Sequence, residues 1–351
     1  MRNVDLKNYI CSVPFDSLEI HNNVCFVCCP SWLPNEIKIN EIPLKDMWNS
    51  ETIIDLRNSI LDGSFKHCNK ELCPHLSKLI NYGVESGPIH RKSNTKYKTP
   101  IIENNTPDNL IMNFDRTCNY KCPSCRVDLI VENSEGIKRV EKTIEEIDTY
   151  YSENVKTIYI TGSGDPFVSV GFRNYLRNFN PKKYPKLKSI HLHTNASMWN
   201  KEMWDSMPNI HKYVKSCEIS IDAGTKETYE NKTRLGGDWD SLINNLKFIS
   251  TIKTLFNVKT SFVVQDSNYM EMGVFYNLMN SIFGDKVNVF FNKIVNWGTF
   301  SDGEYKLKQV WNEHHPEHQL FKNEFNKIWK NKNLHHNLYE FIDKEQIKSL
   351  I

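Results

Sequence analysis

The chain has 351 residues, 39% of them hydrophobic, which is enough to bury the core of one large domain and a smaller one. Its 44 Lys and Arg against 42 Asp and Glu give a net charge of +2, so no whole-chain charge favours nucleic acid or an anionic membrane as partner. No apolar run is long enough to span a bilayer, and the polar start lacks the apolar core of a signal peptide. We therefore expect a cytoplasmic protein.

Cysteine is unusually frequent, with ten residues, of which only Cys217 lies beyond residue 125. A reducing cytoplasm disfavours a framework of disulfides, so metal ligation is the better explanation. The clustering indicates that the metal chemistry is concentrated early in the chain.

Residues 1–83 are predicted to form a small α+β module rich in cysteine. Two extended runs, Ser17–His21 and Val24–Cys28, are separated by two asparagines that tolerate a tight turn, which predicts a hairpin. Further along, Ser50 is placed to cap a helix that Gly63 ends.

Residues 84–107 are polar and broken by Gly and Pro, which is typical of a linker. Extended and helical runs then alternate over residues 108–295. Six runs are predicted as strands: Leu110–Phe114, Thr157–Thr161, Ser189–His193, Glu218–Asp222, Val258–Val264 and Val287–Phe291. The clearest helices are a run with Ile137, Val140, Ile144 and Ile147 on one face, then Asp240–Leu255 and Tyr269–Phe283.

This alternation predicts an α/β fold whose parallel strands form an open sheet or a partial (βα)6 barrel. In such folds, ligands bind at the carboxyl ends of the strands. Residues 296–351 are predicted to form a helical extension rich in histidine. His314 and His318 have the spacing of a metal pair, but Pro316 between them argues against a regular helix, so solvated histidines are favoured.

Three cysteines, Cys118, Cys122 and Cys125, follow the first of the six strands in a C-x3-C-x2-C pattern. A structural zinc takes four ligands, whereas an iron–sulfur cubane held by three cysteines keeps one iron open. Because the loop lies where an α/β sheet places its active site, we favour the cluster over a zinc that borrows a fourth ligand.

This loop, placed after strand one of six strand–helix units, resembles the radical SAM superfamily over about residues 108–295. The resemblance implies a [4Fe–4S] cluster on the three cysteines, whose open iron binds S-adenosylmethionine. One electron then cleaves that cofactor to a 5′-deoxyadenosyl radical, which requires a reductant such as flavodoxin or ferredoxin. Ser124 replaces the aromatic residue that often supports the adenine in this family, so another residue must pack that base.

A glycine-rich turn after the second strand, Gly162-Ser-Gly164-Asp165-Pro, is similar to the GGE motif of the same family. Glycines let the backbone approach a bound ammonium group, and Asp165 can accept its N–H bonds. Taken alone, the turn would be an ordinary one.

Four further residues are candidates for contacts with the cofactor by the same resemblance. Ser220 and Asp222 match positions that often meet the ribose, and Arg234 matches a basic residue that meets the carboxylate. The alternatives are a helix-capping Ser or Asp and a surface arginine. Asn195, after the third strand, is the fourth candidate.

The order of the amino-terminal cysteines resembles the auxiliary-cluster module called SPASM, or its shorter twitch form, which in most relatives follows the barrel. The resemblance assigns a second [4Fe–4S] cluster to Cys11, Cys28, Cys68 and Cys73. Cys29 is an alternative to Cys28, because strand alternation places these two residues on opposite faces. A structural zinc on the same four residues also stays open.

Cys217 stands alone before the fourth strand and is favoured as a packed core residue. Its functional alternative, by analogy with radical epimerases, is the donation of a hydrogen atom to a substrate radical.

We therefore predict a radical SAM enzyme that abstracts hydrogen from an unactivated C–H bond, with dehydrogenation, epimerisation or a related change as the outcome. A small molecule or carbohydrate is favoured as substrate, because the cysteine module takes the place of a peptide-recognition domain. The alternatives are a peptide-modifying maturase and a non-catalytic scaffold held by clusters or zinc.

Overall fold

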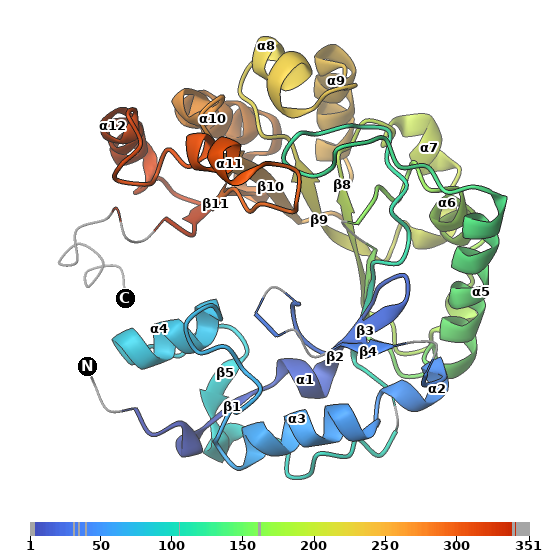
Figure 1. The fold of residues 1–351 in the computed structure, drawn as a ribbon. Coiled ribbons are helices and arrows are strands. Elements are labelled where there is room, and N and C mark those ends of the chain that lie inside the picture. The colour runs from blue at the N-terminus through green and yellow to red at the C-terminus, as the bar shows by residue number, and fades with distance from the viewer. Residues whose placement is uncertain are drawn as a thin grey trace. The chain divides into compact units, whose positions relative to one another are not determined.

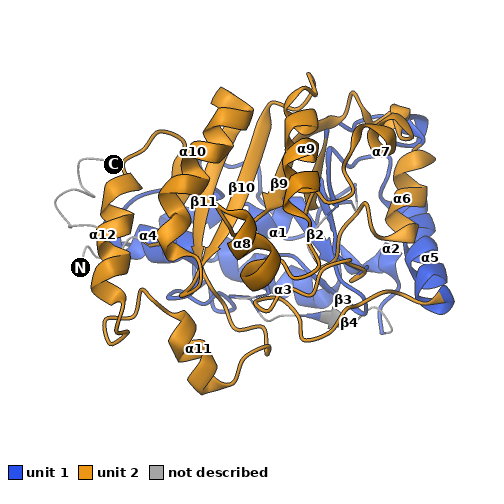
Figure 2. Ribbon diagram, turned by 90° about the horizontal axis from the view of Figure 1, so that it is seen from above, with its two compact units in different colours: residues 1–115, 134–160, 180–189 blue, residues 116–133, 161–179, 190–351 orange. Residues whose placement is uncertain are grey.

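The computed structural model describes residues 4–30, 32–33, 36–38, 41–104, 106–160, 163–338 and 341. The chain forms two compact units, which Figure 2 shows in different colours. Unit 1 consists of residues 1–115, 134–160 and 180–189, and unit 2 of residues 116–133, 161–179 and 190–351. Each unit draws on separate stretches of sequence, and the domain boundaries expected at residues 83, 107 and 295 stay a prediction.

Unit 1 contains a sheet of five strands in the order β7-β6-β2-β3-β4 (Figure 1). The strands are β2 (Ser17–Ile20), β3 (Val24–Phe26), β4 (Ile37–Lys38), β6 (Asn109–Met112) and β7 (Thr157–Ile160). The pairs β2–β6 and β6–β7 are parallel, whereas β2–β3 and β3–β4 are antiparallel. The predicted hairpin is confirmed, and β2 joins it directly to the first strand of the predicted barrel.

The core of unit 1 forms where apolar strand residues meet helices. Leu18, Leu110 and Ile158 lie side by side on the three parallel strands and are fully buried. The helices are α1 (Val13–Asp16), α2 (Leu44–Met47), α3 (Glu51–Leu61), α4 (Pro74–Tyr82) and α5 (Ser134–Tyr150). As predicted, α3 follows Ser50 and ends before Gly63, and its apolar face is buried, but the Ser50 side chain does not make the expected capping hydrogen bond.

The segment predicted as a linker, residues 84–107, is part of unit 1. It contains β5 (Ile89–Arg91), which pairs antiparallel with β1 (Tyr9–Cys11), and Ile89 is buried. The fully buried Arg57 of α3 donates from Nη1 to the carbonyl of Pro100 at 2.9 Å. The pairing of β5, the buried Ile89 and the Pro100 carbonyl contact thus connect this segment to the rest of unit 1.

Unit 2 contains five parallel strands in the order β12-β11-β10-β9-β8. They are β8 (Ser189–Thr194), β9 (Val214–Ser220), β10 (Asn257–Val264), β11 (Val287–Lys293) and β12 (Leu334–His336). The helices are α6 (Val170–Arg177), α7 (Lys201–Asp205), α8 (Lys226–Thr228), α9 (Trp239–Ser250), α10 (Met272–Phe283), α11 (Asp302–Lys308) and α12 (His318–Ile328). All six predicted barrel strands exist, and the α/β fold class is confirmed.

Strand β9 differs from its predicted range in an informative way. It begins four residues earlier, at Val214, and ends at Ser220 rather than Asp222. Asp222 has a φ of 60°, a left-handed conformation that cannot continue a strand. The strand therefore ends in a sharp turn that redirects Asp222.

The carboxyl-terminal part is only partly the solvated histidine-rich helix that the sequence suggests. Helix α12 begins at His318, so His314 lies outside it, as Pro316 predicts. However, His335 and His336 belong to β12. The ring of His335 stacks on Phe290 of β11 at a centroid distance of 4.7 Å, and burial lowers the pKa of His336 to about 4.

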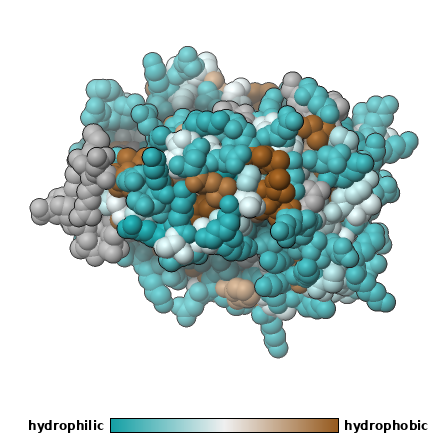
Figure 3. Space-filling model, turned by 90° about the horizontal axis from the view of Figure 1, so that it is seen from below, coloured by the Kyte–Doolittle hydropathy of each residue, from teal (hydrophilic) through white to brown (hydrophobic). Residues whose placement is uncertain are grey.

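None of the described helices combines the length and the apolar character needed to cross a membrane. The face of the molecule in Figure 3 is mainly hydrophilic, with a few apolar patches between polar side chains.

Candidate active site

The three cysteines of the predicted cluster site lie in one loop of unit 2. Cys118 and Cys122 are 8% and 4% exposed, whereas Cys125 is exposed. The backbone N–H groups of Cys125 and Arg126 both donate to the carbonyl of Cys122, at 2.9 and 3.1 Å. This tight turn brings the last two cysteines close together.

Each of the three sulfur atoms accepts a hydrogen bond from a different side chain. Cys125 Sγ accepts from Arg126 Nη2 at 3.5 Å, Cys122 Sγ from Arg234 Nη1 at 3.5 Å, and Cys118 Sγ from Asn195 Nδ2 at 3.6 Å. These three pairs are Cys118 with Asn195, Cys122 with Arg234 and Cys125 with Arg126.

This set of donors fits a bound iron–sulfur cluster. Cysteine binds a metal as the thiolate, which N–H donors and positive charge stabilise. Burial raises the pKa of Cys118 and Cys122, and Arg234 acts on both thiols in the opposite direction. The three residues can therefore hold a cluster and present negatively charged sulfur to it.

Arg234 reaches Cys122 because Asp222 holds it. Arg234 Nη2 lies 2.7 Å from Asp222 Oδ2, and the two side chains are 11% and 1% exposed. Asp222 is itself fixed, since its Oδ1 accepts a hydrogen bond from the backbone N–H of Val263 at 2.7 Å. The sequence predicts cofactor contacts for Arg234 and Asp222, and in the structure the two residues form an ion pair beside the cysteine loop.

Asp165 joins the cysteine loop to the end of β8. Its backbone N–H donates to the carbonyl of Thr117, while its Oδ2 accepts from Thr194 Oγ1 at 2.7 Å and from the N–H of Asn195 at 2.8 Å. With Oδ1 bonded to the N–H of Phe167, both carboxylate oxygens have partners within the protein. Asp165 thus positions Asn195, and its predicted contact with the cofactor's ammonium group stays a prediction.

The structure describes only one of the two glycines of the same motif. Gly164 lies in the turn that leads to Asp165, whereas Gly162 lies outside the described residues.

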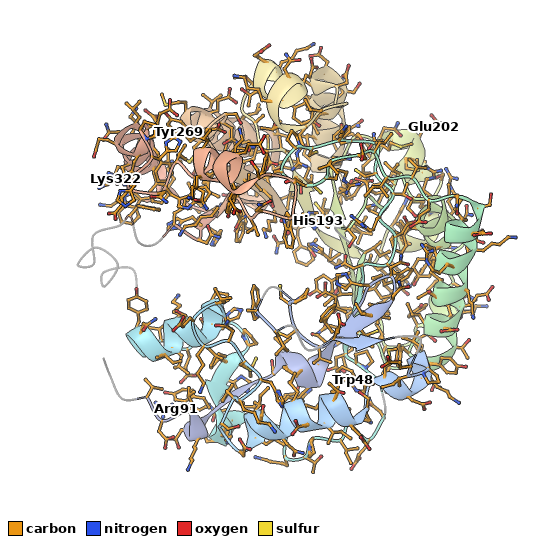
Figure 4. The ribbon with its side chains drawn as sticks, in the orientation of Figure 1. Trp48, Arg91, His193, Glu202, Tyr269 and Lys322 are labelled. Atoms are coloured by element: carbon orange, nitrogen blue, oxygen red, sulfur yellow. The ribbon has the colours of Figure 1, made fainter. Side chains whose placement is uncertain are left out.

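Ser220 belongs to a polar strand face that the sequence reading missed. Its hydroxyl is 2.9 Å from His193 Nε2, and Figure 4 shows His193 on the side of the strands away from helices α9 and α10. On the same face, Glu218 Oε2 pairs with Lys259 Nζ at 3.0 Å and Oε1 accepts from the hydroxyl of Ser261. The alternation of Ser216, Glu218 and Ser220 along β9 is the signal that could have revealed this face.

Charges on this face balance one another. Burial lowers the pKa of His193, while the neighbouring Glu218 acts in the opposite direction. Although burial acts in the opposite direction, His193 and Lys259 lower the pKa of Glu218 to about 2. The face thus carries one negative and one positive charge in contact, beside neutral donors and acceptors.

Cys217 lies on the opposite, apolar face of β9. It is fully buried between Leu192 and Val258 of the neighbouring strands, and burial raises its pKa. This is the packing of a core residue. Hydrogen donation by Cys217 stays a prediction that its surroundings do not favour.

A cavity of about 440 Å³ lies next to the cysteine loop. Pro123, which directly follows Cys122, lines it together with Phe300 and with the ion pair of Lys308 and Asp266. Among the described residues that line it, Phe300 is the only aromatic one.

The four cysteines predicted for the auxiliary site come together in unit 1. Cys11 interacts electrostatically with Cys28, Cys68 and Cys73, and Cys68 with Cys28 and Cys73. Burial, and then the neighbouring thiols, raise the pKa of Cys68 to about 12. Burial also raises the pKa of Cys28, to about 11.

A cavity of about 220 Å³ lies among these cysteines. Cys11, Cys28, Cys29 and Cys73 line it, together with Trp32. The indole N–H of Trp32 is buried and faces the Cys28 thiol, on which its hydrogen bonding acts to lower the pKa. No three His, Cys, Asp or Glu side chains among the described residues are arranged to hold a single metal ion.

Residues 112–264 match the family model described as the radical SAM superfamily. The similarity to this family covers this central stretch, which is less than half of the chain. The match includes the three cysteines, Asp165, Asn195 and the Asp222–Arg234 pair. Members of this family use a [4Fe–4S] cluster and S-adenosylmethionine, the two cofactors that the sequence predicts.

Similar solved structures include SuiB of Streptococcus suis bound to the precursor peptide SuiA, at 16% identity and a TM-score of 0.45 over 82% of this chain and 57% of that one. Another is anSMEcpe with bound AdoMet, at 19% identity and a TM-score of 0.43 over 69% of this chain and 61% of that one. The chain thus spans less than two thirds of the length of either protein. No curated protein sequence matches it.

Proposed function

We propose that the chain is a radical SAM enzyme that abstracts a hydrogen atom from an unactivated C–H bond of a small-molecule or carbohydrate substrate, leading to dehydrogenation, epimerisation or a related change. The observation that carries the proposal is the set of three cysteines whose sulfur atoms each accept an N–H bond from Asn195, Arg234 or Arg126. A cluster bound there supplies the electron that cleaves S-adenosylmethionine to an adenosyl radical.

The polar face of β8, β9 and β10 supports a neutral, hydroxyl-rich substrate. Ser220 and His193 can each donate and accept hydrogen bonds, and Glu218 with Lys259 adds an acceptor and a donor without net charge. A face without net charge does not select an ionic group, whereas it can bind several hydroxyl groups at once. Sugars and related alcohols have this chemistry.

The adenine of S-adenosylmethionine fits the cavity beside Pro123. Ser124 cannot stack on a base, but Phe300 presents an aromatic ring to the same cavity, and Lys308 Nζ lies 6.0 Å from the centroid of that ring. We assign to Phe300 the packing role that the aromatic residue of the cysteine loop often has in this family.

The amino-terminal module is proposed to hold a second [4Fe–4S] cluster on Cys11, Cys28, Cys68 and Cys73. Mutual electrostatic interaction among these four residues favours Cys28 over Cys29 as ligand. The buried N–H of Trp32, in the cavity lined by Cys28, offers a donor to a cluster sulfur. A cytoplasmic location and a flavodoxin or ferredoxin as reductant complete the proposal, because both clusters need a reducing environment.

The decisive test is anaerobic reconstitution with iron and sulfide, followed by reduction in the presence of S-adenosylmethionine. We expect 5′-deoxyadenosine to form, and Cys122→Ala to abolish both its formation and cluster loading at this site. Cys25→Ala is the matched control, since Cys25 is fully buried and belongs to neither proposed ligand set. A loaded wild-type protein that forms no 5′-deoxyadenosine would be a scaffold and not an enzyme of this kind.

The substrate class is tested by running the same reaction with deuterium-labelled candidate substrates. A labelled sugar or polyol that transfers deuterium to 5′-deoxyadenosine supports the proposal. Transfer only from a labelled peptide would identify a peptide maturase instead.

A further inference from the structure

Arg126 directly follows the last cysteine of the triad and is only 8% exposed. Its Nη2 donates to Cys125 Sγ at 3.5 Å and to the carbonyl of Ser163 at 3.1 Å, and its Nη1 donates to the carbonyl of Arg116 at 3.1 Å. Among the described residues, no carboxylate pairs with this guanidinium. Its full positive charge therefore faces the thiols.

The other arginine of the site is different. Arg234 also reaches a sulfur atom, but Asp222 neutralises it at 2.7 Å. A second carboxylate, that of Asp165, acts electrostatically on Cys118 and does not pair with Arg126. Asn195 donates a hydrogen bond without charge. Arg126 is thus the one uncompensated cation in contact with the triad within the described residues.

We propose that Arg126 sets the reduction potential of the cluster held by Cys118, Cys122 and Cys125. This inference rests on the cluster site of the proposed function. One electron added to the cluster increases the negative charge beside these sulfur atoms, and a desolvated cation in contact stabilises that reduced form more than the oxidised one. A guanidinium does not lose its proton, so the effect is permanent. Arg126 thereby raises the potential and makes reduction by a flavodoxin- or ferredoxin-type donor easier.

The test is a redox titration of the reconstituted full-length protein, with dithionite as the one-electron source and the signal of the reduced cluster followed by electron paramagnetic resonance. The triad's cluster is recognised as the signal that changes when S-adenosylmethionine is added. We expect Arg126→Gln to lower the reduction equilibrium constant at least tenfold, which is about 59 mV for a one-electron couple. Arg126→Lys, which keeps the charge, should shift it less.

Arg173→Gln is the matched control. Arg173 also donates from its guanidinium to two backbone carbonyls, those of Phe167 and Val168 at 3.0 Å, but the structure gives it no contact with a thiol. Its replacement should leave the potential unchanged, whereas a shift like that of Arg126→Gln would attribute the effect to general loss of packing.

Asp222→Asn tests the same physics with the opposite sign. The substitution keeps a residue that tolerates the left-handed φ of 60° but removes the counter-charge of Arg234, so the potential should rise. This variant decides the matter if Arg126→Gln binds no cluster, because an unchanged potential would then overturn the inference. If the Arg126→Gln protein binds the cluster and keeps the wild-type potential, the inference about Arg126 is wrong and the proposed function is not affected. If the wild-type chain binds no cluster at the triad, the proposed function is wrong as well.

Discussion

At the scale of single residues, the cluster site combines neighbours in sequence with distant partners. Cys118, Cys122 and Cys125 are recognisable from their spacing alone, because one loop supplies all three. Their hydrogen-bond donors are not, since Asn195 lies 77 residues from Cys118 and Arg234 lies 112 residues from Cys122. The sequence motif thus predicts the metal ligands, and only the fold reveals what stabilises them.

Phe300 provides a residue-scale prediction. Replacing it with alanine should raise the KM for S-adenosylmethionine about tenfold, since stacking of a base on an aromatic ring contributes roughly 1–3 kcal/mol. The production of 5′-deoxyadenosine at saturating cofactor should change less than the KM. Phe256→Ala, at a site that is 65% exposed and outside the cavity, is the control. An unchanged KM in Phe300→Ala would remove Phe300 from the adenine site.

At the scale of elements, long buried strands are predicted well and short pairings poorly. The run at Val258–Val264 differs from β10 by one residue, because Val258, Phe262 and Val264 alternate along its buried face and give a clear apolar signal. By contrast, β1 and β5 have three residues each, and their pairing joins segments about eighty residues apart in the chain. Nothing local distinguishes such a pair from a loop.

The pairing of β9 with β10 makes stability depend on pH. The pKa of Glu218 falls from 4.5 to about 2 in the folded protein, so its ionised form stabilises the fold above pH 4.5, and this contribution is lost as the pH drops toward 2. Glu218→Gln should therefore reduce the free energy of unfolding by about 3 kcal/mol at pH 7. In urea titrations at pH 7 and pH 3, the difference from wild type should be smaller at pH 3. A difference independent of pH would show that the carboxylate charge is not its cause.

The second cluster proposed for the amino-terminal module leads to a prediction about the metal content of the protein. One proposed ligand lies in β1, one follows β3, one lies between α3 and α4, and one precedes α4. Cys68→Ala should reduce the iron from roughly eight atoms per chain, as in two cubanes, to roughly four. Cys29→Ala should keep the wild-type content. If Cys29→Ala loses iron and Cys28→Ala does not, Cys29 is the ligand in place of Cys28. Zinc in place of iron would identify a structural zinc site.

At the scale of the whole molecule, the two compact units cannot be predicted from local patterns. The sequence suggests four consecutive segments, whereas unit 1 combines the amino-terminal module with α5, β6 and β7. Which strands share a compact unit depends on tertiary packing, which hydrophobic periodicity does not report. The domain boundaries expected from composition therefore stay predictions.

Metal removal should affect the two units separately. Because the four cysteines of unit 1 come from three separate segments, namely β1, the chain after β3 and the chain between α3 and α4, a cluster there joins these segments, and chelation of iron should lower the Tm of the reconstituted protein. Cys68→Ala should lose more thermal stability than Cys122→Ala, whose three ligands share one loop. Scanning calorimetry of the two variants measures this difference, and equal Tm values would contradict a structural role for the auxiliary site.

The parallel pairing of β2 with β6 has a consequence for attempts to shorten the protein. Leu18 and Leu110 lie side by side in that ladder, so a chain begun at residue 108 would leave the backbone groups along one side of β6 without partners and would uncover apolar side chains. Such a bare edge invites association with another strand, and the fragment should form aggregates rather than a smaller enzyme. The cysteine-rich module is therefore not a detachable accessory, because its strand β2 covers the edge of β6 that such a fragment would expose.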